Sequence, residues 1–262
     1  MLRGALAAIL FLVVPAAAGP FPAEMVGAGG CPRCDLASAE LRGIAIEGAD
    51  FEKAVLRDAD LKGARLPRAR FAGADLRRAE LEGSVLDGAD FSNAELAGAD
   101  LEKASAKAAI FRSARMARVD LENLAGPDTD FSRADLRGAL LRRADLTRAR
   151  LVEADLREAD MERVLLTGAD LSSAKLDSAD LDRAELAGAV LRHAQLADVR
   201  LSSANLVGAD LRGANLRSAR LRRTNLSGAD LSDTHGLTQK QLDQACGEAA
   251  KLPRGLTLRP CP

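Results

Sequence analysis

Two pairs of cysteines are the residues whose type and spacing could do chemistry in this 262-residue chain. Cys31 and Cys34 enclose a Pro-Arg dipeptide and form a C-x-x-C motif. Such a motif is typical of thiol-disulfide exchange when a βαβ unit stands beside it. Cys246 and Cys261 lie near the other end of the chain. Whether these thiols react or only link the chain depends on the elements that hold them.

The other ionisable residues form no recognisable catalytic motif. His193 and His235 are the two histidines, and neither has a second metal-ligating residue at ligand spacing. The sequence contains no nucleophile elbow, no H-E-x-x-H pair and no phosphate-binding loop. Asp recurs at a fixed place in a repeat, where its side chain can hydrogen-bond turn backbone. We therefore expect no catalytic residues, no metal and no cofactor.

A five-residue repeat runs from Asp35 to Asp233 without an insertion. Each unit has a small residue, Asp or Asn, a large apolar residue and two variable residues. The large residue is Leu, Phe, Ile or Met in 38 of 40 units. Residues five apart would be rotated by ~140° on a helix and would switch faces on a strand. A coil that turns a corner in every unit keeps each large residue inside, so the period predicts a solenoid.

Five phenylalanines indicate how many units make one coil. Within the repeats they are all twenty residues apart, at Phe51, Phe71, Phe91, Phe111 and Phe131. Four units per coil would stack the rings in one column of the core. The spacing thus predicts four walls, twenty residues per coil and about ten coils, which is a rod ~45–50 Å long at the spacing of β-strands.

These repeats resemble the pentapeptide-repeat family, whose motif is A(D/N)LXX, over residues 34–233. The resemblance implies an all-β fold, a right-handed quadrilateral β-helix. The central Leu or Phe and the preceding Ala would point inward. The Asp or Asn between them and the two variable residues would point outward. We assign residues 31–233 to this β-helix.

The N-terminal segment carries the pattern of a signal peptide over residues 1–18. Arg3 precedes an apolar run, and Ala16-Ala17-Ala18 is a suitable cleavage site. The run is too short to serve as a transmembrane anchor, so we expect none in the mature form. Residues 19–30 are rich in Gly and Pro and are expected to form a flexible leader.

Residues 234–262 depart from the repeat and are expected to cap the rod. Thr238 and Gln241 match a capping box, which predicts a short α-helix at about 239–245. A solenoid needs such a cap because its last coil otherwise exposes unpaired strand edges.

The length of the rod limits how the cysteines can pair. The two pairs would lie ~45 Å apart, whereas the Cα atoms of a disulfide lie within ~7 Å. A bond between the ends and a single four-cysteine zinc site in a monomer are both excluded. We predict the local disulfides Cys31–Cys34 and Cys246–Cys261, which fit an exported protein in the periplasm or outside the cell.

One wall of the predicted rod carries a defect in two neighbouring coils. Ala106 and Gly126 stand where a large apolar residue is usual, and Leu124 stands where Ala is usual. Gly126-Pro127 adds a turn signal. The pattern predicts an irregular coil near 119–130. It is either a kink refilled by Leu124 and Ile110, or a notch at Ala106, Leu124, Gly126 and Pro127 that binds a partner or small ligand.

The charge balance argues against the best-known activity that the resemblance implies. Some members of the family are thought to bind DNA gyrase by imitating duplex DNA, which carries one charge per ~1.7 Å of axis. Residues 31–125 hold 17 acids and 15 bases, and residues 128–233 hold 18 and 17. Acids and bases alternate, as in Glu102-Lys103, and we expect this alternation along each wall.

Direct nucleic-acid binding is not expected either. The chain has no Trp and no Tyr to stack on bases. A basic stretch near the end of the repeats is expected to spread over three walls; it comprises Arg212, Arg217, Arg220, Arg222 and Arg223.

The sequence therefore predicts an exported, non-enzymatic structural or interaction module. Its outer faces would bind a protein partner, and it would be a rigid β-helical rod. A DNA mimic that binds gyrase or topoisomerase is the first alternative, and a thiol-disulfide redox protein that uses Cys31 and Cys34 is the second.

Overall fold

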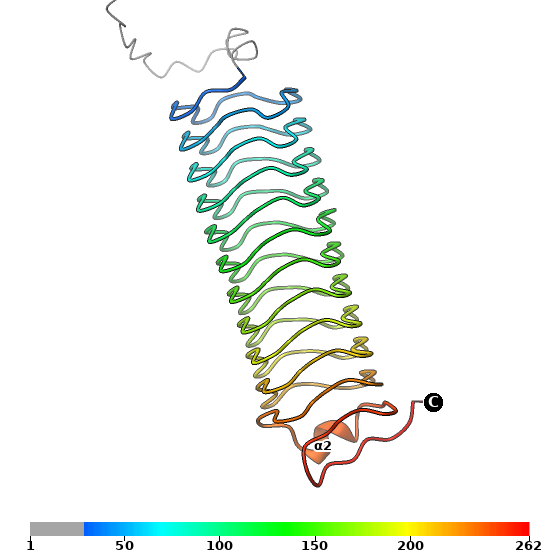
Figure 1. Cartoon of the computed structure of the whole chain (residues 1–262). Helices are drawn as coiled ribbons and strands as arrows, with labels where there is room; N and C mark the ends of the chain where they lie inside the picture. The colour runs from blue at the N-terminus through cyan, green and yellow to red at the C-terminus, as the bar shows by residue number, and fades with distance from the viewer. Residues whose placement is uncertain (1–28, 262) are drawn as a thin grey trace, which may run out of the picture.

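The computed structural model describes residues 29–261 as one rod of stacked coils (Figure 1). The predicted signal peptide and most of the predicted leader lie outside the described residues. Parallel bridges join residues that are twenty apart, from Gly30 and Asp50 to Asn215 and His235. One coil therefore takes twenty residues, and the bridges form four ladders, one on each wall. The period of twenty and the four walls predicted from the phenylalanine spacing are confirmed.

Each wall is named here after an early residue of its ladder. The Asp35, Glu40, Ala45 and Asp50 walls each continue at every twentieth residue. Neighbouring coils pair as parallel strands do: the Asp60 N–H donates to the Ala39 carbonyl at 3.0 Å. Because each coil turns a corner every five residues, the pairing on one wall is a single bridge wide. No longer strand forms within residues 29–261.

The corner between two walls is made by the two variable residues of each unit. The second of them takes the left-handed backbone conformation, with φ +68° at Gly98 and +57° at Arg118. The N–H of the following small residue closes the turn; Ala64 donates to the Leu61 carbonyl at 3.0 Å. This turn bends the chain between each large apolar residue and the next, which keeps both of them inside.

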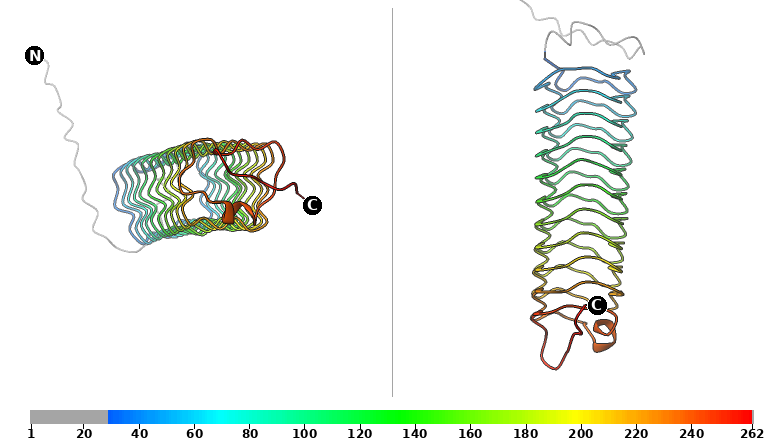
Figure 2. Two further views of the ribbon diagram at one scale, coloured as in Figure 1. Left: turned by 90° about the horizontal axis from the view of Figure 1, so that it is seen from below. Right: turned by 90° about the vertical axis from the view of Figure 1, so that its right-hand side faces the viewer.

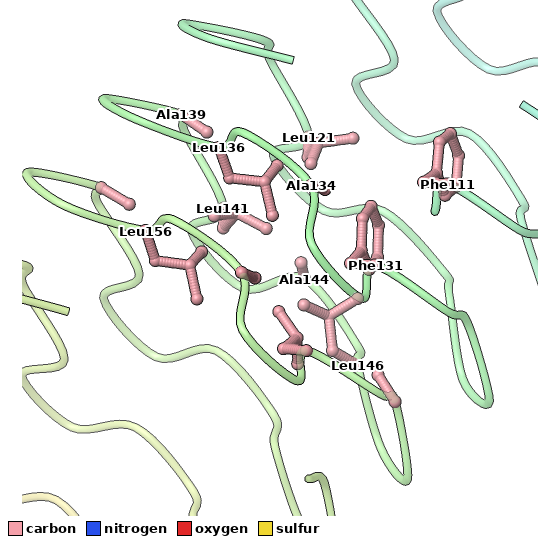
Figure 3. Close-up of a cluster of buried hydrophobic side chains, with 14 of the residues drawn as sticks. Phe111, Leu121, Phe131, Ala134, Leu136, Ala139, Leu141, Ala144, Leu146 and Leu156 are labelled. Atoms are coloured by element: carbon pink, nitrogen blue, oxygen red, sulfur yellow. The ribbon is translucent and has the colours of Figure 1, made fainter. Parts of the chain in front are cut away.

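The core is a filled column of apolar side chains. The phenylalanine rings stack with centroids 4.7–5.2 Å apart and planes within 14° of parallel. Leu136, Leu141 and Leu146 pack around Phe131 from the other walls and are fully buried (Figure 3). Burial of one such side chain contributes about 1.5–3 kcal/mol. A core repeated in this way makes the rod rigid and leaves its outer surface to carry function.

The C-terminal end of the rod is closed by α2 (Gln239–Leu242) and the tail that follows it (Figures 1 and 2). Thr238 caps α2, and both bonds of the predicted capping box with Gln241 are present. Gln241 Nε2 also donates to the carbonyls of Leu216 and Ala219, at 2.8 and 3.0 Å. α2 thus satisfies carbonyl groups of the last coil.

The prediction that this helix continues to Ala245 is wrong. α2 ends at Leu242, and Asp243 is its C-cap. The chain must straighten there because Cys246 rejoins the Ala45 wall, where it pairs with Asn225. The Cys246 N–H then donates to the Thr224 carbonyl at 3.0 Å. The pairing of Cys246 with Asn225 therefore limits α2 to about one turn.

The opposite end begins with the coil that follows Gly30. There Leu36, Ala39 and Ile44 are only partly buried, unlike their counterparts further along the rod. Across residues 29–261 no helix has the length and apolar character needed to cross a bilayer.

Candidate interaction surfaces

The cysteines lie at the two ends of the rod, as paired disulfides. Cys31 and Cys34 are bonded, with Cα atoms 5.6 Å apart, and Cys246 and Cys261 are bonded, with Cα atoms 4.7 Å apart. The first bond pins the start of the first coil. The second ties the tail to the last coil, where Cys261 also lies 3.5 Å from Asn225 Oδ1. No βαβ unit stands beside the C-x-x-C motif in the described part of the chain.

The candidate notch is filled. Leu124 and Ala106 are buried, and a Cβ placed on Gly126 would lie 3.0 Å from Leu124 Cδ2 and 3.2 Å from Thr129 Cγ2. The bridges continue without a break through this region, at Ala125 and Asp130. The structure therefore has no concavity for a ligand at Ala106, Leu124, Gly126 and Pro127, because the larger Leu124 takes the space.

The regular aspartates serve the turns of the coil. In many units Oδ1 accepts the N–H two residues on, as from Glu52 to Asp50 at 3.0 Å and from Glu102 to Asp100 at 2.9 Å. This Asx turn orients the corner that follows. No group of three or more metal-ligating side chains gathers anywhere in residues 29–261. His193 and His235 lie on different parts of the surface, one at a corner and one in the Asp35 wall.

An open groove of about 670 Å³ runs along the corner between the Asp35 and Glu40 walls. Small residues such as Gly98 form its floor, and its charged lining residues are Arg77, Arg78, Arg118, Arg137, Arg157 and Glu158. Most of these arginines bind carboxylates beside the groove: Arg77 lies 2.7 Å from Asp75 and Arg157 lies 2.6 Å from Asp155. Their charge is thus largely neutralised, which weakens the groove as an anion site.

The same ion pairs shift the pKa of the wall carboxylates. A hydrogen bond from Arg77 lowers the pKa of Asp75, and one from Arg137 lowers the pKa of Asp135. Asp120 behaves in the opposite way: burial raises its pKa, and the negative charges of Asp100 and Glu102 add to this effect. The Glu40 wall around Asp120 is therefore short of positive charge.

Charge on the Glu40 wall is sorted by coil. The outer surface of this wall is formed by the ladder residue of each unit and by the first variable residue of the same unit. Side chains at these two positions contact each other between neighbouring coils: Lys62 lies 2.7 Å from Glu80, and Arg142 lies 2.5 Å from Asp160. Over six coils these two positions hold ten carboxylates and one base, Arg142. The carboxylates are Glu80, Glu82, Asp100, Glu102, Asp120, Glu122, Asp160, Glu162, Asp180 and Asp182.

The predicted alternation of acids and bases along each wall is therefore wrong. Lys103, Arg163 and Arg183 follow the acids in sequence but lie at the corner, where the backbone φ is positive. They contact the rim of the acidic run; Lys103 lies 2.8 Å from Glu102 and Arg183 lies 2.7 Å from Glu162. Residues that are adjacent in sequence can therefore lie on different surfaces of the rod. For this reason the separation of the acids on the wall from the bases at the corner is not evident from the order of residues along the chain.

The arginines near the end of the repeats occupy three walls, as expected. Arg212 pairs with Asp210 at 2.6 Å on the Asp50 wall. Arg217 belongs to the Asp35 wall, and Arg220 and Arg222 belong to the Glu40 wall. These last two are exposed, and no carboxylate of residues 29–261 lies within 4.0 Å of either.

The sequence of the repeats matches the model of one known protein family. The family model described as pentapeptide repeats matches in 8 copies between residues 34 and 233, with a gap at 124–128. This match covers most of the described rod. A comparison with curated protein sequences gives no match.

Solved structures of three relatives show similarity over different shares of the chain. HetL, a pentapeptide repeat protein involved in heterocyst differentiation regulation from the cyanobacterium Nostoc sp. strain PCC 7120, is 34% identical, with 87% of this chain and 92% of that chain covered and a TM-score of 0.37. QnrB1, a plasmid-mediated fluoroquinolone resistance protein, is 20% identical, with 72% and 94% covered and a TM-score of 0.56. A pentapeptide repeat protein from the Arabidopsis thaliana thylakoid lumen is 30% identical, with 46% and 79% covered and a TM-score of 0.29.

Proposed function

Because this chain belongs to the pentapeptide-repeat family, whose members form right-handed quadrilateral β-helices and generally act as structural or interaction modules rather than enzymes, we propose that it is an exported rod that binds a protein partner. The observation that carries the proposal is a filled core surrounded by four rigid ladders. Equivalent side chains recur every ~4.8 Å along each wall, which suits recognition of another extended surface.

Export is supported by two features of the ends. The signal-peptide pattern over residues 1–18 places the predicted cleavage after Ala18. The two disulfides suit an oxidising compartment, the periplasm or the exterior. The mature protein would then consist of the leader, a β-helix of about ten coils over residues 31–233 and the cap over residues 234–262.

Cell fractionation with intact mass analysis tests this proposal. The expected product lies outside the cytoplasm, begins at Gly19 and carries two disulfides. Partner capture from that compartment, with the rod as bait, would follow. An uncleaved cytoplasmic protein with four free thiols would refute export and the role assigned to the disulfides.

A DNA mimic that binds gyrase or topoisomerase is the second candidate, and the acidic part of the Glu40 wall supports it. Ten carboxylates over five coil steps, or ~24 Å, give one carboxylate per ~2.4 Å, although eight of them already lie within 4.0 Å of a base. Duplex DNA carries one per ~1.7 Å. The test is a gyrase supercoiling assay with the purified rod: inhibition that is lost when Asp100 and Glu102 are changed to Lys would support this candidate, and unchanged supercoiling would remove it.

A further inference from the structure

Unpaired charges of opposite sign lie on one wall of the rod, far apart along its length. On the Glu40 wall, Asp100 and Asp120 have no base within 4.0 Å among residues 29–261, although most acids around them do. Arg220 and Arg222, six coils beyond Asp100, have no acid within this distance. Six coil steps span ~29 Å, so these groups cannot meet within one molecule.

The wall that carries them is suited to lying against another flat surface. The coils keep nearly the same orientation along the rod in two perpendicular views (Figures 1 and 2). The ladder pairs continue at steps of twenty from Glu40 to Arg220 without a shift. A side chain on this wall therefore has a fixed place along the rod, set by its coil.

We propose that the Glu40 wall is the docking surface for a second copy of this chain, laid antiparallel against the first. The two-fold axis crosses the wall at Asp160, which is midway between the coils of Asp100 and Arg220. Two walls related in this way put opposite charges face to face. The facing residues are Asp100 and Arg220, Glu102 and Arg222, Asp120 and Arg200, and Arg142 and Asp182, each pair formed twice.

The charge pattern selects this register over its neighbours. An axis half a coil nearer the N-terminus forms as many opposite-charge pairs, but it sets Asp120 against Asp180 and Glu122 against Asp182, each twice, which is four like-charge contacts instead of two. An axis half a coil nearer the C-terminus sets the Asp160 coil against the Asp180 coil, with the same result. At the proposed axis, like charges meet only where Asp160 and Glu162 face their own copies. Arg142 and Arg183 already contact these two carboxylates, at 2.5 and 2.7 Å.

A second copy is the occupant that the observations favour, because the acidic and basic parts lie on one wall at distances that match each other. A basic partner alone would leave Arg220 and Arg222 unused. The wall is ~10 Å wide and the facing coils span ~30 Å, so the contact buries on the order of 600 Å² in total. This is below the ~1,200 Å² at which stable specific interfaces begin, so the dimer is expected to be weak, transient and governed by charge.

Sedimentation velocity of the full chain measures the association directly. Over a concentration series at low ionic strength, the weight-average mass should rise from monomer to dimer. In about 0.5 M NaCl the screening length falls well below 10 Å, and the chain should be monomeric. A monomer at every concentration and salt would overturn the proposal.

Charge-reversal variants test which residues face each other. Arg220→Glu with Arg222→Glu, and separately Asp100→Lys with Glu102→Lys, should each weaken self-association by about tenfold or more. An equimolar mixture of the two variants should associate again, because each offers the charge that the other lacks. Arg65→Glu with Lys175→Glu changes the net charge equally on other walls and serves as the control. Association that persists in both variants, or fails to return in the mixture, would refute the pairing.

The residue on the two-fold axis tests the register. Asp160→Asn removes the facing like charges and should tighten the dimer, whereas Asp182→Asn removes the charge that faces Arg142 and should weaken it. Asp160→Cys should be cross-linked into a dimer by a bis-maleimide that spans ~10 Å, the spacing of facing β walls, while Glu40→Cys on the same wall should not, because no coil faces it. Equal cross-linking of the two cysteine variants would overturn the antiparallel register.

Discussion

Leu124 Cδ2 lies 3.0 Å from the point where a Cβ on Gly126 would stand. The two residues are neighbours in one corner of the core, and the larger one compensates for the missing side chain of the other. Leu124 is also fully enclosed, since only 1% of its surface is exposed. The coil keeps its ladder pairs at Ala125 and Asp130 as a result. The irregular composition of this segment is thus a local repacking of the core.

Leu124→Ala should lower the free energy of unfolding by about 3–5 kcal/mol, because Gly126 and Ala106 beside it cannot fill the cavity. The double variant Leu124→Ala with Gly126→Leu restores the usual pattern of the repeat and should recover much of the loss. Urea denaturation followed by circular dichroism gives these values. A cost below about 1 kcal/mol would show that neighbouring residues collapse into the space that Leu124 leaves, and that Leu124 is not needed to fill it.

Phe91→Ala should destabilise the rod more than Phe51→Ala. Phe91 stacks on two rings, with centroids 4.7 and 4.8 Å away, whereas Phe51 stacks on one at 5.2 Å among the described residues. The expected cost at Phe91 is about 3–5 kcal/mol, and the lost ring contact adds about 1 kcal/mol relative to Phe51. Both variants can be compared in the same urea series. Equal costs would mean that stacking adds nothing beyond burial.

Gln241→Ala should loosen the C-terminal end of the rod. This side chain completes the capping box and donates to the carbonyls of Leu216 and Ala219. The expected loss is about 1–2 kcal/mol, with faster hydrogen exchange in the last coil. Gln244→Ala is the matched control, since Gln244 is exposed and, among residues 29–261, its side chain bonds only to the Lys240 carbonyl. Similar exchange in both variants would argue against the capping role.

Two aspartates on different walls should respond to pH in opposite directions. Arg212 and then Arg192 lower the pKa of Asp210, so its charge stabilises the fold at neutral pH and this contribution is lost on acidification below the unfolded value of ~4. Burial raises the pKa of Asp120, so its charge costs stability at neutral pH, and the cost disappears as the pH falls through the folded-state pKa.

At pH 7, Asp210→Asn should therefore lower stability and Asp120→Asn should raise it, each by less than about 1 kcal/mol. Asn keeps the Oδ1 atom that accepts the turn N–H in both places, so only the charge changes. Both differences should shrink between pH 7 and pH 3 when urea midpoints are compared. If both variants changed the free energy of unfolding in the same direction, the conclusion that burial of the Asp120 carboxylate destabilises the fold at pH 7 would be wrong.

The architecture could be predicted because every five-residue unit places its large apolar residue and its polar residues at the same positions. Forty units without an insertion allow one period, and the five phenylalanines fix the number of units in a coil. The rings do stack at that spacing. The capping box at Thr238 and Gln241 was also visible, because both of its bonds are local in sequence.

Features that depend on contacts between coils could not be read from neighbouring residues. The end of α2 depends on Cys246 meeting Asn225, a contact across the last coil. The acidic wall depends on residues twenty apart, whereas Glu102 and Lys103 look neutral together in sequence. Reading every twentieth residue from Glu80, together with the residue two after it, would have revealed the run of carboxylates.

The steps of twenty also mean that the two ends of the rod never contact one another. Each coil bonds only to the coil before it and the coil after it, so a duplicated segment of twenty residues would find both of its neighbours already in register. Such a chain would lengthen by ~4.8 Å and keep the same cross-section. The distance along the rod between two surface groups on one wall is therefore fixed by the number of residues between them, at ~4.8 Å for every twenty.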